Sequence, residues 1–498
     1  MPDYDAIVIG AGCGGMTAGA VLAKQGRKTL VLEQSGRVGG CCSTYEREGY
    51  RFDVGATILE IIRPFELAFE RLGTTFQEEV ELEPCDPVYN IIFQDGSRMT
   101  YPSSIEEKAE IISRISPEDG KGWLEYAKYF GDFMRTALNG FFVSPANNMV
   151  DMTRMLMKDP HMLKFFPLFG QSFEGIIRKY FKNERVQDSL SYQGFFCGQP
   201  PALAPGIFAF LSYSEHEGVY YPKGGMIAVP EALRRCGERF GLEVRTGQQV
   251  DRVMVRDRKV EGVVLADGTE ITAPVIVSNI NAKRLYLEKI GEEHLSWLSR
   301  YGIKSYNISV SAPMINVGLD YKPPLDAHHT IVTASMDRLN DYWFGGMRQG
   351  RLPEETFGLV CFPTLSDASM APEGHHVLNI VLAGPYDMKE IDWDRDKQAY
   401  GERQLELLSE KAVPGLADHV QVMDVATPRD FERRLLSPEG AILGLDMDIT
   451  SSAMFRPAAR SKSIKGLYLT GASTHPGGGV PSVMSSGVIA ADLIEKYE

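Results

Sequence analysis

The chain has 498 residues, 44% hydrophobic and 24% charged, which is enough to bury a large core and excludes extended disorder. A formal net charge of −14 repels phosphate backbones, so nucleic-acid binding is not expected. The seven cysteines include no Cys-x-x-Cys pair. They therefore indicate free thiols in a reducing, cytoplasmic compartment, and no metal site is expected.

The uncharged run of residues 6–23 resembles a membrane span only at first sight. Five glycines interrupt it, and no Lys or Arg precedes it as a signal peptide requires. For these two reasons a spanning helix is not expected from this run.

The N-terminal segment, as far as Glu33, predicts a strand, a turn, a helix and a second strand. The apolar patterns favour a strand over Tyr4–Gly10, a helix over Cys13–Gln25 and a strand over Thr29–Glu33. The turn, residues 10–15, fits the G-x-G-x-x-G pattern of dinucleotide-binding folds. A glycine-rich helix start without a ligand is the alternative, and the ordered context disfavours it.

The three motif glycines of this turn each have a separate expected role. Gly10 allows the tight turn, Gly12 lets the backbone approach a pyrophosphate beside Ala11, and Gly15 lets the helix lie close to the sheet. The helix N-terminus offers free N–H groups and a positive dipole to phosphates. Glu33 ends the second strand, where its carboxylate can accept both ribose hydroxyls of an adenosine.

Two following runs resemble FAD enzymes of the monoamine oxidase and phytoene desaturase type. Residues 37–40, Arg-Val-Gly-Gly, resemble their R-x-G-G element, and Phe52–Gly55 resembles their F-D-x-G run. The resemblance implies FAD as the cofactor, with Gly39 and Gly40 close to it. Arg37 would supply charge to the pyrophosphate, although a lone surface arginine is the alternative.

The middle of the chain continues this resemblance. Residues 221–226 resemble the Y-Y-P-x-G-G run of carotenoid desaturases, and residues 275–279 resemble their V-V-S-N run. Val250 is expected near the adenine, and a plain β-meander without ligand contact is the alternative. No second G-x-G-x-x-G unit occurs, so the electron partner stays open between oxygen, a quinone and another protein. The elements expected here are a helix over 227–240, strands over 244–255, 260–265 and 274–278, and a hairpin turn at 267–269.

Near its end, the chain predicts a strand over Gly466–Gly471, a glycine-rich loop and a helix over Ser482–Tyr497. This run resembles the closing segment of phytoene desaturase relatives, which holds the flavin ring and ribityl chain. The resemblance therefore implies that Gly471, Gly479 and Val480 contact FAD. His475 lies in the loop and is interpreted as ordering it, and no catalytic acid or base is identified.

The expected fold is α/β, with a Rossmann-like FAD-binding domain of the glutathione reductase and amine oxidase type, interleaved with an α+β substrate domain. Residues 1–60, 215–285 and 460–498 are assigned to the FAD-binding domain. Residues 61–214 and 286–459, which carry no nucleotide signature, are assigned to the substrate domain.

The segment 149–169 is rich in Met and Phe, with Pro160 and Pro167 excluding one continuous helix. It is interpreted as a peripheral membrane contact, as the lining of a lipid tunnel or as ordinary core of the second domain. These three alternatives are left open.

The resemblance to the phytoene desaturase, carotenoid isomerase and retinol saturase group implies an FAD-dependent oxidoreductase. Its reaction would be desaturation, saturation or double-bond isomerisation of an apolar isoprenoid or polyene, such as a carotenoid or retinoid. A non-enzymatic prenyl-lipid escort of the same fold and a flavin amine oxidase are the alternatives. The expected location is cytoplasmic, with membrane association where the substrate partitions into lipid.

Overall fold

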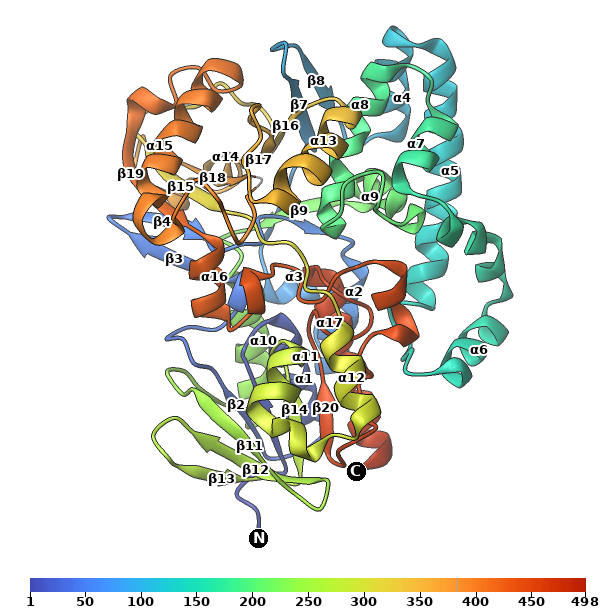
Figure 1. Ribbon diagram of the computed structural model, residues 1–498, viewed down its shortest axis with the longest axis vertical. Helices are drawn as coiled ribbons and strands as arrows, with labels where there is room; N and C mark the ends of the chain where they lie inside the picture. Colours follow the sequence, from blue (N-terminus) through green and yellow to red (C-terminus); the bar gives the residue numbers. More distant parts are fainter. Residues whose placement is uncertain (383) are drawn as a thin grey trace.

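A parallel five-stranded sheet forms the lower part of the computed structural model, which describes residues 1–382 and 384–498 (Figure 1). Each neighbouring pair of strands is parallel. In spatial order the strands are β10 (Glu243–Arg245), β2 (Thr29–Leu32), β1 (Ala6–Ile9), β14 (Val275–Ser278) and β20 (Leu467–Leu469).

Both faces of this sheet are covered, because alternate side chains of a strand point to opposite faces. Ala6 and Val8 of β1 pack against one apolar cluster, and Ile7 and Ile9 pack against another. The first cluster includes helices α1 (Cys13–Lys24), α2 (Arg63–Leu72), α10 (Ala228–Glu238) and α17 (Val480–Tyr497). The second includes an antiparallel meander of β11 (Val250–Arg256), β12 (Lys259–Leu265) and β13 (Glu270–Thr272).

The strand, helix and strand predicted for the N-terminal segment are confirmed within two residues at each end. The helix after residue 227, strands β12 and β14, and the closing strand and helix are also confirmed within two residues. The single strand expected over 244–255 is wrong, because that segment forms two strands, β10 and β11, in different sheets. Packing on the lower sheet continues past residue 285 through α12 (Trp297–Ser305), whose Ile303 belongs to the second cluster. The residue bounds assigned to the two domains stay a prediction.

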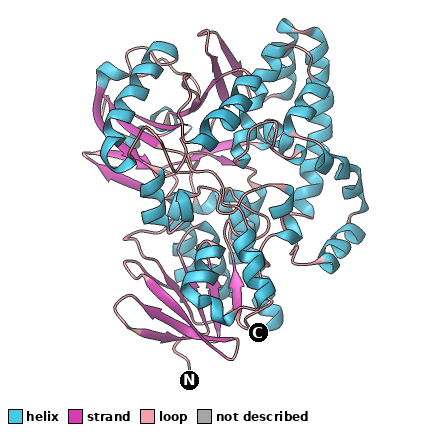
Figure 2. Cartoon of the chain, viewed as in Figure 1, coloured by secondary structure: helices cyan, strands magenta, loops and turns pink. Residues whose placement is uncertain are grey.

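A second, seven-stranded sheet forms the upper part of the molecule (Figure 2). Its strands pair antiparallel except for β7 and β16, which are parallel. Helix α15 (Trp393–Lys411) packs on one face. In spatial order the strands are β19 (Val420–Ala426), β15 (Met314–Leu319), β18 (His376–Leu382), β17 (Gly358–Cys361), β16 (His329–Thr333), β7 (Tyr89–Phe93) and β8 (Arg98–Tyr101).

A lobe of helices lies beside this sheet, on the right in Figure 1. Its helices are α4 (Ile105–Ile115), α5 (Pro117–Asn139), α6 (Met149–Lys158), α7 (Phe173–Tyr180), α8 (Glu184–Ser191) and α9 (Leu211–Ser214). Between the two halves lies a small sheet of β5 (Leu59–Glu60), β9 (Val219–Pro222) and β6 (Leu82–Pro84), near a hairpin of β3 (Thr44–Arg47) and β4 (Tyr50–Asp53).

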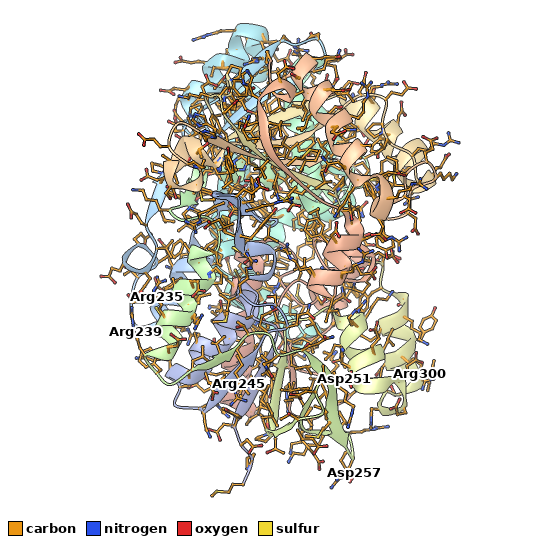
Figure 3. The ribbon with its side chains drawn as sticks, turned by 90° about the vertical axis from the view of Figure 1, so that its left-hand side faces the viewer. Arg235, Arg239, Arg245, Asp251, Asp257 and Arg300 are labelled. Atoms are coloured by element: carbon orange, nitrogen blue, oxygen red, sulfur yellow. The ribbon has the colours of Figure 1, made fainter. Side chains whose placement is uncertain are left out.

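Charged side chains lie on the outside of the lower half. Figure 3 shows Arg235 of α10 and Arg239, just after this helix, at its outer edge, and Asp257 at the tip of the β11–β12 hairpin. Among the described helices, none is at once long enough and apolar enough to cross a bilayer. All seven cysteines are free thiols, as the sequence indicates.

We predict that Gly15→Ala destabilises the fold. A Cβ at position 15 would lie 2.1 Å from the Gly10 carbonyl oxygen, so α1 would have to move away from β1. Overpacking of this kind costs about 1–3 kcal/mol of unfolding free energy, which urea unfolding followed by fluorescence measures. Gly36→Ala is the control, because a Cβ there meets no atom within 4 Å. Equal unfolding midpoints for the two variants would contradict the prediction.

Candidate active site and its cavity

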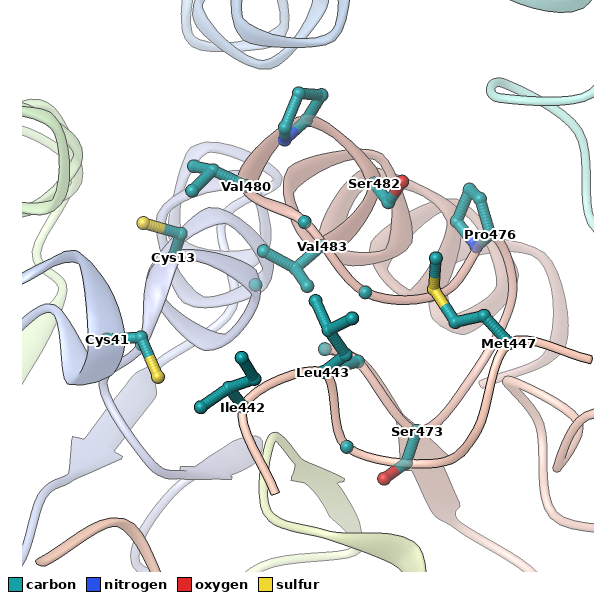
Figure 4. Close-up of a pocket in the computed structure, with 18 of the residues that line it drawn as sticks. Cys13, Cys41, Ile442, Leu443, Met447, Ser473, Pro476, Val480, Ser482 and Val483 are labelled. Atoms are coloured by element: carbon teal, nitrogen blue, oxygen red, sulfur yellow. The ribbon is translucent and has the colours of Figure 1, made fainter. Parts of the chain in front are cut away.

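A cavity of about 850 Å³ extends from the ends of the lower strands to the helical lobe. Its walls come from loops after β1, β2, β14 and β20, and from residues of α5, α6 and β5. Figure 4 shows the part nearest the lower sheet, where Cys13, Val480 and Leu443 surround the space. Segments far apart in the sequence thus share one wall.

The glycine turn after β1 forms the nucleotide end of this wall. Gly10 and Gly12 line the cavity, and Gly10 has a φ of +93°, which favours glycine. A Cβ on Gly12 would lie 2.7 Å from Asn279 Nδ2, so the backbone is open to a ligand only because the side chain is absent. Gly15 does not line the cavity and instead brings α1 close to β1.

Glu33 lies at the end of β2 with 8% of its surface exposed, and it lines the cavity. Its Oε2 accepts the N–H of Ala11 at 2.8 Å, and its Oε1 accepts the N–H of Ser35 at 2.9 Å. Each oxygen keeps a lone pair for a further donor. The carboxylate is therefore fixed in place and can still accept two ribose hydroxyls.

In the R-x-G-G run after Glu33, the two glycines line the cavity and the arginine does not. Gly39 and Gly40 line the cavity with positive φ angles of +110° and +58°. Arg37 is not in the wall, because its guanidinium donates to the Thr44 carbonyl at 3.0 Å and lies over the Tyr45 ring. A role for Arg37 at the pyrophosphate therefore stays a prediction.

The closing segment continues the wall beside the glycine turn. Gly471, Gly479 and Val480 line the cavity, and α17 begins at Val480, so its first free N–H groups lie at the cavity edge. Val250 also lines the cavity, at the start of β11.

His475 orders the loop rather than lining the cavity. It is buried, and its Nε2 donates to the Phe141 carbonyl at 2.8 Å, which ties the loop to the segment after α5. Burial lowers the pKa of His475 to about 4, so the ring is neutral.

Several wall residues were not among those expected from the sequence. Asn279 contacts the glycine turn, and the V-S-N run in which it lies was the available signal. Gly55 ends the F-D-x-G run and residues 56–57 follow it directly, so these wall residues could also have been named. Ile442 and Leu443 come from a long segment without a motif, so only the folded chain reveals them (Figure 4).

The other end of the cavity is apolar, with few polar side chains. The segment 149–169 contributes to it but also forms core and surface: Phe165 is 3% exposed, whereas Met157 is 76% exposed. Parts of the segment thus line the cavity and parts are buried in the core, while a lipid tunnel and a peripheral membrane contact stay predictions. Large apolar residues here are Phe133, Met152, Leu156, Met162, Phe165, Phe166, Phe169, Phe196 and Phe208.

The comparisons with known proteins agree with this geometry. The family model described as flavin containing amine oxidoreductase matches residues 13–495, so the chain belongs to that family. A neurosporene-forming phytoene desaturase from Rhodobacter capsulatus is 32% identical over 98% of this chain and 93% of its own length. A zeta-carotene-forming phytoene desaturase from Myxococcus xanthus is 27% identical over the same shares. The crystal structure of an oxidoreductase from Methanosarcina mazei, 17% identical, matches 98% of this chain and 99% of that chain with a TM-score of 0.66.

The chain is therefore an FAD-dependent oxidoreductase. The expected fold, a Rossmann-like FAD-binding domain interleaved with an α+β substrate domain, is confirmed. The alternative of a non-enzymatic lipid escort is not supported.

We predict that Glu33→Ala weakens FAD binding by about 1–3 kcal/mol, because a charge-assisted hydrogen bond is lost. Titration of apoprotein with FAD, followed by flavin fluorescence, measures the affinity. Glu33→Gln, which keeps an acceptor but removes the charge, should fall between wild type and Glu33→Ala. Glu270→Ala, at an exposed position of β13, should bind FAD like wild type. Wild-type affinity in Glu33→Ala would contradict the contact.

Proposed function

We propose that this flavoenzyme desaturates an apolar isoprenoid or polyene. The observation that carries the proposal is the continuous cavity, which begins at the glycine turns and ends among Phe, Met and Leu side chains. The relatives named phytoene desaturase support the substrate class and the direction of the reaction. An apolar wall holds a hydrocarbon by burial alone, at about 25 cal/mol per Å² of apolar surface removed from water.

The nucleotide end of the cavity fits FAD in the proposed arrangement. The backbone at Gly10–Gly12 would approach the pyrophosphate, Glu33 would hold the adenosine ribose, and Gly479–Val480 would face the flavin ring. Residues 1–60, 215–285 and 460–498 would then form the FAD-binding domain, and residues 61–214 and 286–459 the substrate domain. Bound FAD supplies a hydride acceptor, and the apolar wall positions the ligand and excludes water.

Anaerobic reduction of the bound flavin tests this proposal. We expect bleaching of the flavin absorbance by carotenoid precursors or other saturated isoprenoids, and none by a panel of primary amines and polyamines. Bleaching by amines alone would favour an amine oxidase. Chemically reduced protein mixed with conjugated polyenes tests the other directions, because saturation would reoxidise the flavin and isomerisation would leave it reduced.

We further propose that the cavity opens toward a lipid surface. Three apolar side chains that line the cavity are also 40–53% exposed: Phe166, Ile449 and Phe455. The mouth of the cavity is therefore rimmed by apolar side chains. Met149, Val150, Met157 and Leu163 continue this exposed surface along α6 and the segment that follows it. Arg154 and Lys164 lie among them, 69% and 44% exposed, where lipid headgroups would lie.

We predict that Met157→Ser combined with Phe166→Ser abolishes flotation with neutral liposomes. Full burial of one such side chain contributes about 1.5–3 kcal/mol, so losing two removes most of the affinity. Flavin content should not change, because neither residue belongs to the nucleotide end. Leu365→Ser, at an exposed apolar position of α14 (Pro363–Ser366), is the control and should float like wild type. Failure of the wild type to float would contradict the proposal.

A further inference from the structure

Glu60 places a carboxyl group in the apolar end of the cavity. It ends the short strand β5 and lines the cavity between Ile58 and Ile61, whereas Leu59 is fully buried outside the wall. The accessible surface that Glu60 retains therefore faces the cavity interior. The nearby wall consists of apolar side chains such as Phe196 and Leu211.

Two hydroxyl groups fix this carboxyl group. The Tyr89 hydroxyl donates to Oε1 at 2.7 Å, and the Ser214 hydroxyl donates to Oε2 at 3.0 Å. Tyr89 is on β7 of the upper sheet and Ser214 ends α9 of the helical lobe. The carboxyl group is thus held by two separate elements, and each oxygen keeps a lone pair for a proton.

Burial and nearby groups shift the pKa of Glu60 upward. Burial is the largest influence and Glu215 adds repulsion, so the pKa of Glu60 rises to about 7 although Tyr89 and Ser214 oppose the rise. Glu215 forms a fully buried ion pair with Lys108 of α4, beside His216. Burial lowers the pKa of His216 to about 3 and that of His329, whose ring contacts Tyr89, well below its usual value.

Four other titratable side chains in the described wall are unsuited to exchanging a proton with a ligand. Glu33 is at the nucleotide end and is bound by two N–H groups. Burial raises the pKa of the Cys41 thiol to about 11, and Arg434 does not release its proton. Lys289 lies in the segment that follows β14 of the lower sheet, near Arg252 of β11. Glu60 is thus the one carboxyl group among the described residues that line the apolar end.

We propose that Glu60 is the catalytic base that takes a proton from the ligand, an inference that rests on the proposed function. One C–H bond of the ligand breaks and its electron pair and hydrogen pass to FAD as hydride. The neighbouring C–H bond breaks, its proton moves to the Glu60 carboxylate, and its electron pair forms the new C=C bond. Ligand oxidation is thereby matched by FAD reduction, and the proton is held by Glu60.

The position of Glu60 along the chain suits this task. Gly55 lines the cavity against Cys41 at the nucleotide end, and only a short segment of extended chain separates it from Glu60. Such a segment spans at most about 17 Å even when fully extended, so Glu60 lies no farther than that from the part of the wall at Gly55. A base whose pKa is close to the working pH is also the most efficient one.

Glu60→Gln is the direct test, because it keeps the size of the side chain and removes the base. We expect unchanged FAD content and a fall of about 10²- to 10⁴-fold in the rate at which a polyene precursor reduces the flavin. In wild type this rate should rise with pH through about 7, where Glu60 ionises, and Glu60→Gln should lack that dependence. Glu83→Gln, on strand β6 of the same small sheet but outside the cavity wall, is the matched control and should behave like wild type.

Ser214→Ala separates catalysis from a structural role. The Ser214 hydroxyl favours the ionised carboxylate, so its loss should move the rising limb of the pH profile to higher pH while preserving the maximal rate. The infrared spectrum gives a readout without turnover. A carboxyl band that titrates near pH 7 should be present in wild type, shifted in Ser214→Ala and absent from Glu60→Gln.

Two results would overturn the inference in distinguishable ways. If wild type is reduced by a polyene precursor and Glu60→Gln is reduced at the same rate with the same pH profile, Glu60 is not the base and the proposed function stands. If no isoprenoid or polyene reduces the wild-type flavin, the proposed function fails and this inference fails with it.

Discussion

Helix α1 can lie against strand β1 only because position 15 has no Cβ, and the arrangement of the cofactor end depends on this approach. The Gly10 carbonyl oxygen occupies the place where a side chain would stand. With α1 so close, its N-terminus lies over the ends of the parallel strands, and Glu33 can accept the N–H of Ala11. The sheet, the turn and the ribose acceptor are thus fixed together by one close packing contact.

The same sheet brings distant parts of the chain to one cavity. Parallel strands direct their carboxyl ends to one edge, so the loops after β1, β14 and β20 meet there although they are far apart in the sequence. The helical lobe then closes the space with aromatic side chains that offer few hydrogen bonds. Burying a polar group in such a place costs folding free energy unless the group is hydrogen-bonded. The carboxyl group of Glu60 is hydrogen-bonded by Tyr89 and Ser214, and its presence among apolar side chains points to a function.

The sequence predicted the lower half well because its signals are local. A glycine pattern between a β-branched strand and a helix has few alternatives, so the elements around Gly10, Gly12 and Glu33 were placed within two residues. The upper half was not resolved into strands, because its pairs join distant segments: β7, which begins at Tyr89, pairs with β16, which begins at His329. Glu60, Ile442 and Leu443 were missed for the same reason: their roles come from what folds beside them. Arg37 shows the opposite case, in which a motif predicts a ligand contact but the folded chain holds the side chain outside the cavity wall. Its guanidinium is bound by the Thr44 carbonyl and lies over the Tyr45 ring.

Strand β20 has a consequence for how this protein is made in the cell. It pairs with β14 in the sheet that contains β1, but β1 ends at Ile9 and β20 begins only at Leu467. At a synthesis rate of roughly 5–20 residues per second, the ribosome works for about 20–90 s after β1 before β20 can join the sheet. Until then the edge of β14 has no partner on that side and is a template for wrong pairing. The nascent chain therefore carries this open edge from the synthesis of β14 until β20 is made, and the wall that FAD would contact is complete only after α17 is released.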